Sequence, residues 1–288
     1  VNTVMGKTSI VGDKEGWTME DLKALMAKYP DASVFGDTTT RSELLWMFMM
    51  YSGSQFVNRE TGKCSFDSQE FVDLLEFMKQ FPEEFDYSAL PDDYWMNSQK
   101  AYRDGKILLM SLNISDMENY ITNVGMFGEP VTLIGFPAKE GNGAVITPNN
   151  VYMISSKSKN SDGAWQFLRY YLTDEYQKDS NDSWSLPIKK DALKEKINKG
   201  TEKPYWINSD GGKEYYEYTA WLGDEEVTLD PLTQEQADDL YNYICSVTQA
   251  YYSDDSLSNI ITEESAAFFS GQKSAQDVAD LIQSRAQI

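Results

Sequence analysis

Carboxylates are the only abundant groups in this chain that could carry out acid–base chemistry. The 288 residues include 46 aspartates and glutamates but no histidine, which excludes imidazole catalysis, histidine-based triads and histidine-ligated metals. A pair of carboxylates is enough for a glycosidase, so that class stays open as one alternative. Spacing along the sequence cannot pair the carboxylates. Most of them flank helix starts or turns, where capping and helix-dipole effects account for them.

A second set of residues has the side-chain types that bind sugars without reacting with them. An aromatic ring packs against the apolar face of a pyranose, while amides and carboxylates hydrogen-bond its hydroxyls. Packing in the core is the alternative for each aromatic, and it applies most directly to Trp46, whose neighbours are apolar. The aromatic and amide residues at or beside helix starts, strand ends and loops are Trp46, Tyr51, Asn113, Asn149, Asn150 and Trp184.

No motif indicates a cofactor or a metal. Gly6-Lys7-Thr8 looks like the end of a phosphate-binding loop, but Val1 stands where the first glycine of that motif belongs. The two cysteines, Cys64 and Cys245, lie far apart and outside any C-x-x-C pattern, so they indicate neither a zinc site nor a redox pair. We therefore expect no cofactor and no metal.

The composition predicts a folded, acidic protein. Hydrophobic residues make up 41% and aromatic residues 13% of the chain, which is too rich for a disordered sequence. A formal charge of −21 disfavours nucleic acid and anionic membranes as partners. No run approaches the roughly 18 apolar residues of a membrane span, and residues 1–12 lack the pattern of a secretion signal. Either the protein is cytoplasmic or its targeting segment is absent here.

Helices and short strands alternate in the first two thirds of the chain, which is typical of an α/β protein with a small sheet covered by helices. Capping-box spacing predicts the starts of three helices. The pairs are Thr18 with Asp21, Asp67 with Glu70, and Ser274 with Asp277. We expect extended chain over 1–11, strands over 107–112, 131–134 and 151–154, and hairpins over 56–66 and 215–229. Helices are predicted over 19–28, 39–51, 67–81, 94–104, 162–172, 191–199, 234–250, 257–269 and 274–288.

Four short segments occur in an order and spacing that are hard to obtain by chance. They are 12–18 (GDKEGWT), 101–110 (AYRDGKILLM), 154–160 (ISSKSKN) running into 164–168 (AWQFL), and 269–274 (FSGQKS). In this order they resemble the family 1 extracellular solute-binding proteins of ABC importers, the group that includes maltose-binding protein. The resemblance covers nearly the whole chain.

The resemblance implies a periplasmic-binding-protein-like fold of type II, here mostly the helix-rich C-terminal lobe with a small mixed sheet. That lobe would comprise 1–154 and 189–288, whereas 155–188 would return to an N-terminal lobe whose start is missing from this chain. The implied function is capture of a mono- or oligosaccharide and its delivery to an ABC permease, without catalysis. The implied location is extracellular, as a membrane-anchored lipoprotein of a Gram-positive bacterium or as a periplasmic protein, with the signal absent.

The resemblance also places the expected cleft residues. The strand end 113–116 matches a cleft edge where relatives often have an aromatic residue, and this chain has Asp116 instead. The turn 147–150, the helix that starts near Arg41 and the segment 255–258 match three further parts of the cleft. The expected ligand-binding residues are Arg41, Trp46, Tyr51, Asn113, Asp116, Asn149, Asn150, Trp184, Asp255 and Ser258. A glycosidase with paired carboxylates and a helical protein-interaction module remain the alternative functions.

Overall fold

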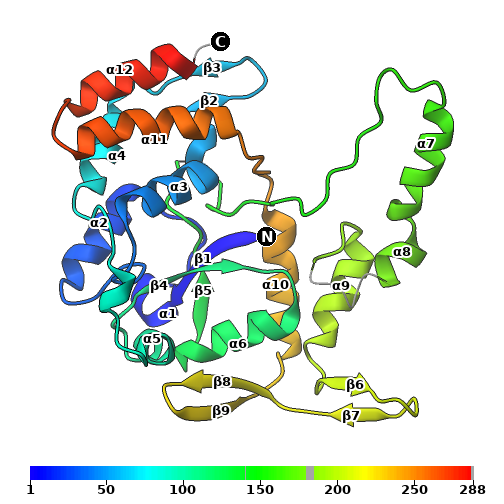
Figure 1. Ribbon diagram of the computed structural model, residues 1–288. Helices are drawn as coiled ribbons and strands as arrows, with labels where there is room; N and C mark the ends of the chain where they lie inside the picture. The colour runs from blue at the N-terminus through cyan, green and yellow to red at the C-terminus, as the bar shows by residue number, and fades with distance from the viewer. Residues whose placement is uncertain (140, 180–184, 287–288) are drawn as a thin grey trace.

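A small antiparallel sheet lies at the centre of the chain (Figure 1). A computed structural model describes residues 1–139, 141–179 and 185–286. The sheet has the strand order β4–β1–β5, with β1 at Asn2–Lys7, β4 at Leu109–Asn113 and β5 at Val131–Leu133. β1 is the middle strand and pairs antiparallel with both neighbours. The extended chain predicted over 1–11 is confirmed for β1, but Thr8–Val11 form the short helix α1.

Side chains of the sheet alternate between two hydrophobic clusters. Val4 and Leu109 belong to one cluster, whereas the adjacent Met5 and Met110 belong to the other. Because successive side chains of a strand point to opposite faces, both faces of the sheet are covered by other elements. This arrangement confirms the predicted small sheet between helices. A parallel bridge between Ser33 and Ile107 adds to the antiparallel ladders.

Five helices supply most of the residues of the cluster that contains Val4. They are α2 (Met19–Lys28), α3 (Arg41–Ser52), α4 (Gln69–Met78), α11 (Asp255–Phe269) and α12 (Ala275–Ala286). The predicted capping box of Thr18 and Asp21 is confirmed, and Thr40 forms another with Glu43 at the start of α3. The predicted cap at Asp67 is wrong, because no side chain caps the start of α4.

The second cluster, which contains Met5, is formed by further helices and a hairpin. They are α5 (Tyr94–Arg103), α6 (Met117–Phe127), α9 (Lys190–Lys199), α10 (Gln234–Ser246), β8 (Tyr218–Leu222) and β9 (Glu225–Leu229). The hairpin predicted around Gly223 is confirmed, although its first strand begins three residues later than expected. Gly223 has a φ of 72°, in the left-handed region that glycine adopts most easily.

An arm leaves the body after residue 146 and returns at α9 (Figure 1). It carries α7 (Ser161–Leu168), η3 (Arg169–Leu172) and α8 (Asp174–Asp179). The strand predicted over 151–154 is wrong, since this stretch is exposed chain and Met153 is 87% exposed. Its β-branched and aromatic residues are typical of strands, but a strand forms only where a neighbouring edge is available for pairing.

Two more hairpins and two short turns complete the described chain. The hairpin predicted over 56–66 is confirmed as β2 (Val57–Asn58) and β3 (Lys63–Cys64). The sequence did not predict the hairpin of β6 (Tyr205–Ile207) and β7 (Lys213–Tyr215). The 3-10 turns are η1 (Gly53–Gln55) and η2 (Tyr87–Ala89).

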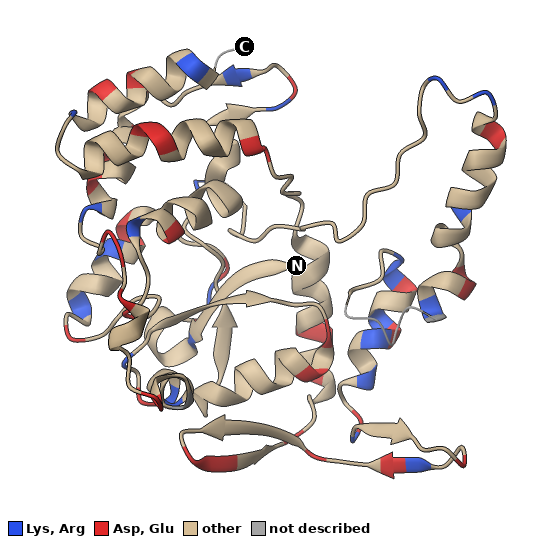
Figure 2. Cartoon of the chain, viewed as in Figure 1, with Lys and Arg blue, Asp and Glu red and all other residues tan. Residues whose placement is uncertain are grey.

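No described helix has the length and apolar character needed to cross a membrane. Charged residues lie mainly on the outer helices and turns, and the central sheet has few of them (Figure 2).

Candidate functional site

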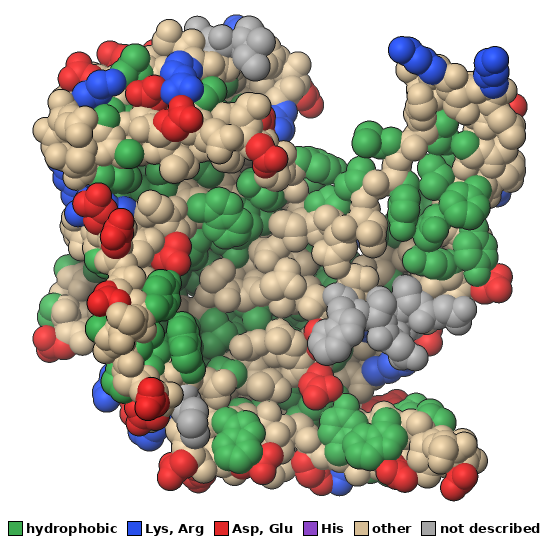
Figure 3. Space-filling view, viewed as in Figure 1, with side chains coloured by type: hydrophobic (Ala, Val, Ile, Leu, Met, Phe, Trp, Pro, Cys, Tyr) green, Lys and Arg blue, Asp and Glu red, His purple; other side chains and the backbone are tan. Residues whose placement is uncertain are grey.

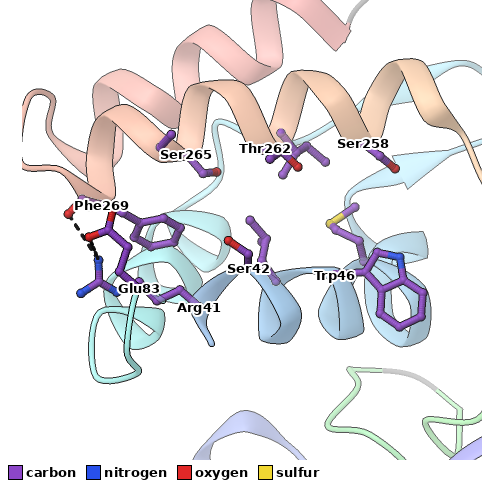
Figure 4. Close-up of a pocket in the computed structure, with 12 residues that line it drawn as sticks. Arg41, Ser42, Trp46, Glu83, Ser258, Thr262, Ser265 and Phe269 are labelled. Atoms are coloured by element: carbon purple, nitrogen blue, oxygen red, sulfur yellow. Dashed lines mark hydrogen bonds and ion pairs between the residues drawn. The ribbon is translucent and has the colours of Figure 1, made fainter. Parts of the chain in front are cut away.

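A hollow opens between α3 and α11, two helices from opposite ends of the sequence (Figure 4). The empty space in and above the hollow amounts to about 670 Å³, with open solvent included. Each helix contributes one face, because residues three or four positions apart project from the same side. The lining residues are Arg41, Ser42, Leu45, Trp46 and Met49 from α3, Glu83 from the loop after α4, and Ser258, Ile261, Thr262, Ser265, Ala266 and Phe269 from α11.

The floor of the hollow is apolar and its mouth carries an aromatic ring. Leu45 and Ile261 are 5% and 3% exposed and belong to the hydrophobic core. Trp46, next to Leu45 in sequence, is 52% exposed at the far end of the hollow from Arg41 (Figure 4). Core packing therefore does not account for Trp46, and its indole is available to a ligand.

Hydroxyl groups supply most of the polar chemistry of the hollow. Ser258, Thr262 and Ser265 lie on the face of α11 that is turned toward α3, and Ser42 lies opposite them (Figure 4). Ser265 is 1% exposed, and its Oγ has no hydrogen-bond partner among the described residues. A buried polar group without a partner costs about 1–3 kcal/mol, so a ligand hydroxyl that reached Ser265 would remove that cost.

Arg41 closes the other end of the hollow. Its Nε donates to the main-chain oxygen of Phe81 at 2.8 Å, and its Nη1 lies 3.5 Å from Oε2 of Glu83. The same Nη1 donates to the main-chain oxygen of Phe269 at 3.4 Å, and the guanidinium carbon is 5.4 Å from the ring centroid of Phe269. The cation thus lies at the carbonyl end of α11, where the helix dipole favours positive charge. Arg41 holds the two helices together.

A row of polar side chains runs along one end of the central sheet. Asn113 Nδ2 donates to Asn2 Oδ1 at 2.9 Å, and Asn2 Nδ2 donates to Thr147 Oγ1 at 2.6 Å. The pairing of β1 with β4 explains this contact, because Asn2 is opposite Asn113. On the same strand as Asn113, the Ser111 hydroxyl is 3.1 Å from the hydroxyl of Tyr51. Burial raises the pKa of Tyr51 to about 12, so this phenol stays neutral.

The remaining expected residues lie elsewhere. Asp116 caps α6 by accepting from the backbone N–H of Asn119 at 2.8 Å. Asp255 begins α11 and accepts from the hydroxyl of Ser253 at 2.8 Å, outside the lining of the hollow. The amides at 149 and 150 are exposed at the base of the arm, and Trp184 lies outside the described residues. The structure therefore brings together Arg41, Trp46 and Ser258, and separately connects Tyr51 with the polar row.

Sequence reasoning missed several groups that line the hollow. Ser258, Thr262 and Ser265 are spaced four and three residues apart, which puts them on one stripe of α11. This spacing was the sequence signal for a row of hydroxyls on α11, but only Ser258 was identified from the sequence. Glu83 is the only carboxylate among the described residues that line the hollow. In the described part of the chain, no three His, Cys, Asp or Glu side chains form a group able to hold a metal ion.

Residues 2–205 match the family described as bacterial extracellular solute-binding protein, and the chain belongs to that family. The fold is that of the maltose-binding type of periplasmic binding protein, as the resemblance of the four short sequence segments implies. A search of curated protein sequences gives no significant match.

Solved structures agree with the family assignment at the level of the fold. The chain superimposes with a TM-score of 0.54 and 11% identity on the cyclic alpha-maltosyl-1,6-maltose binding protein from Arthrobacter globiformis, covering 99% of this chain and 69% of that one. The sugar-binding protein MalE from Xanthomonas citri gives 0.53 and 11%, with 99% and 67% covered. A family 1 extracellular solute-binding protein from Alicyclobacillus acidocaldarius gives 0.50 and 12%, with 99% and 69% covered.

Proposed function

We propose that this chain binds a neutral carbohydrate in the hollow between α3 and α11 as part of an ABC import system. The observation that carries the proposal is the half-exposed indole of Trp46 at the mouth of a hollow whose walls carry four hydroxyls. An indole stacks on the apolar face of a sugar ring, and side-chain hydroxyls replace the water that sugar hydroxyls lose. The names of the first two solved neighbours describe sugar binding, which supports this class of ligand.

Charge favours a neutral ligand over an anionic one. The net charge of −21 repels anions at any range that salt does not screen. Arg41, the only cation among the described residues that line the hollow, is already engaged by Glu83 and by two main-chain oxygens. A neutral mono- or oligosaccharide needs no counter-charge and fits the hydroxyl lining.

The same lining argues for binding without catalysis. A glycosidase needs two carboxylates that flank the scissile bond, about 5 to 9.5 Å apart. Among the described lining residues Glu83 has no second carboxylate beside it, and it is paired with Arg41. The family is one of solute-binding proteins, which agrees with this reading.

We further propose that residues 155–188 pack against a second lobe, while 1–154 and 189–288 form the lobe described above. Several apolar side chains of the arm are exposed to solvent, which is unfavourable in water (Figure 3). Phe167 is 66% exposed and Trp165 is 49% exposed. Closure of two lobes over the hollow would cover the sugar, and an ABC permease would receive it. Extracellular attachment as a lipoprotein of a Gram-positive bacterium, or a periplasmic location, is part of the same proposal.

Calorimetric titration with a panel of mono- and oligosaccharides tests the ligand class. We expect heat of binding with at least one neutral sugar and none with amino acids, peptides or polyamines. Binding of a peptide or amine in the absence of any sugar binding would overturn the sugar assignment. Hydrolysis of a chromogenic glycoside that is lost on Glu83→Gln would instead support the enzyme alternative.

A further inference from the structure

A second hollow lies between α9 and the β6–β7 hairpin, away from the site between α3 and α11. It includes about 1920 Å³ of empty space, open solvent included. Helix α9 and the chain that follows it supply polar side chains, and the β6–β7 hairpin, the link after it and β8 supply aromatic rings. The rings are those of Tyr205, Trp206, Tyr216 and Tyr218.

Trp206 is a fixed aromatic platform. Its ring stacks on that of Tyr216, with the centroids 5.6 Å apart and the planes 25° apart. The hydroxyl of Tyr216 donates to Oε2 of Glu118 on α6 at 3.0 Å, which ties the pair to the body of the protein. Trp206 nevertheless remains 53% exposed. Because the indole is already held in place, a ligand that stacks on it need not immobilise a free side chain.

The hairpin that carries Trp206 is ordered by its own side chains. Trp206 lies opposite Glu214, and all six strand residues of the hairpin are exposed. Asn208 fixes the turn, since its Oδ1 accepts from the backbone N–H of Gly212 at 2.8 Å and its Nδ2 donates to Glu214 at 3.0 Å. The platform is therefore presented to solvent on a preformed element.

The polar lining is balanced in charge. The described lining residues include three lysines and three carboxylates, and Lys203 pairs with Glu217 beside the hollow. Cores of protein–protein interfaces are depleted of lysine, glutamate and aspartate, so this lining is unlike a protein docking site. A ring platform beside amide and charged side chains is the combination that recognises sugars. The charged and amide residues of the lining are Asp191, Lys194, Glu195, Asn198, Lys199, Glu202 and Lys203.

We propose that the hollow between α9 and the β6–β7 hairpin is a second carbohydrate-binding site, with Trp206 as the stacking platform for a neutral oligosaccharide. The site is independent of the first, because the two hollows share no lining residue. The second site would let the protein bind an oligosaccharide through a contact outside the hollow between α3 and α11. Two weak contacts with the same long glycan would bind it more tightly than either alone.

Fluorine NMR of the full chain labelled with 5-fluorotryptophan tests this site. The probes are maltohexaose, xylohexaose and chitohexaose at millimolar concentration, and each resonance is assigned with a single Trp→Phe variant. We expect at least one hexasaccharide to shift the Trp206 resonance in the wild type and equally in Trp46→Ala. The Trp221 resonance is the internal control, since Trp221 is 51% exposed on β8 and does not line the hollow.

Two variants then connect the shift to the platform. Tyr216→Ala removes the supporting ring, and Trp206→Ala removes the platform; each should weaken this binding about tenfold, while Trp221→Ala should leave it unchanged. Affinity of the variants is measured by calorimetry, and circular dichroism checks their folding. The proposal is overturned if no hexasaccharide shifts Trp206, if Trp46→Ala abolishes the shift, or if Trp206→Ala binds as tightly as the wild type. If a hexasaccharide shifts the Trp206 resonance but not the Trp46 resonance of the wild type, the result counts against the first site and not against this one.

Discussion

Arg41, the first residue of α3, contacts Phe269, the last residue of α11. Its Nη1 donates to the main-chain oxygen of Phe269 at 3.4 Å, and its guanidinium lies over the Phe269 ring. This contact fixes the spacing of the two helices that form the hollow. The hollow therefore depends on a residue that does not itself need to touch the ligand.

Replacing Arg41 should loosen the two helices. We expect Arg41→Ala to lower the free energy of unfolding by about 1–2 kcal/mol, since charge-assisted hydrogen bonds to main-chain oxygens are lost. Urea denaturation measures the change. Arg59→Ala is the matched control, because exposed Arg59 donates one hydrogen bond to the main-chain oxygen of Tyr252 at 3.1 Å. Equal losses in the two variants would contradict the special role of Arg41.

Phe136 supports the inner side of α3. It is fully buried, its ring stacks on Tyr51 at 5.2 Å, and it meets Phe48 edge-on at 4.5 Å. Phe136→Ala should reduce the free energy of unfolding by about 3–5 kcal/mol through lost burial and a cavity. In the same urea titration Phe167→Ala, on the exposed arm, should change stability by no more than about 0.5 kcal/mol. A small effect at Phe136 would show that the aromatic cluster does not position α3.

The capping box of α2 should give stability that depends on pH. The backbone N–H and the hydroxyl of Thr18 donate to Asp21, and these hydrogen bonds hold the pKa of Asp21 below its ordinary value. A lowered carboxyl pKa contributes stability that is present above about pH 4 and is lost as the pH falls through the lowered pKa.

Asp21→Asn should therefore be less stable than the wild type at neutral pH, and the difference should shrink on acidification. Thermal unfolding followed at several pH values between neutral and acid measures it. Asp31→Asn is the control, because exposed Asp31 makes no hydrogen bond through its side chain to a described residue. A pH-independent difference at Asp21 would contradict the capping interpretation.

Ser265 should affect binding and stability in opposite directions. Its buried hydroxyl lacks a partner, so Ser265→Ala should leave the unliganded protein as stable or up to about 1 kcal/mol more stable. Sugar affinity should fall by about two- to tenfold, because a ligand hydroxyl loses its partner. Ser270→Ala is the control, since that hydroxyl already donates to the Ala266 oxygen at 2.8 Å. Unchanged sugar affinity in Ser265→Ala would remove Ser265 from the site.

Much of the fold could be predicted from local patterns. The Thr18–Asp21 box and the Gly223 turn are signals contained in a few adjacent residues, and both predictions are confirmed. The central place of β1 could not be predicted, because it depends on pairing with strands more than a hundred residues away. Residues 151–154 have the types that favour a strand, but they form none, because they pair with no described strand edge.

The residues of the candidate site could be predicted only in part, because their arrangement also depends on contacts between distant segments. Trp46 and Ser258 have types that suit sugar binding, but sequence alone could not place them on facing helices. The hydroxyls of Thr262 and Ser265 are ordinary in a helix and become informative only when α11 packs against α3. Asp116 has the right chemistry for a hydroxyl, yet its carboxylate caps α6.

Sugar binding at Trp46 is the central claim, and calorimetry on two matched variants tests it most directly. Trp46 and Trp221 are 52% and 51% exposed, but only Trp46 lines the hollow between α3 and α11. With the sugar that the wild type binds, Trp46→Ala should lose about tenfold or more in affinity, because the stacking face is removed. Trp221→Ala should bind as the wild type does. Wild-type affinity in Trp46→Ala, with both variants folded, would contradict the assignment of this hollow as the carbohydrate site.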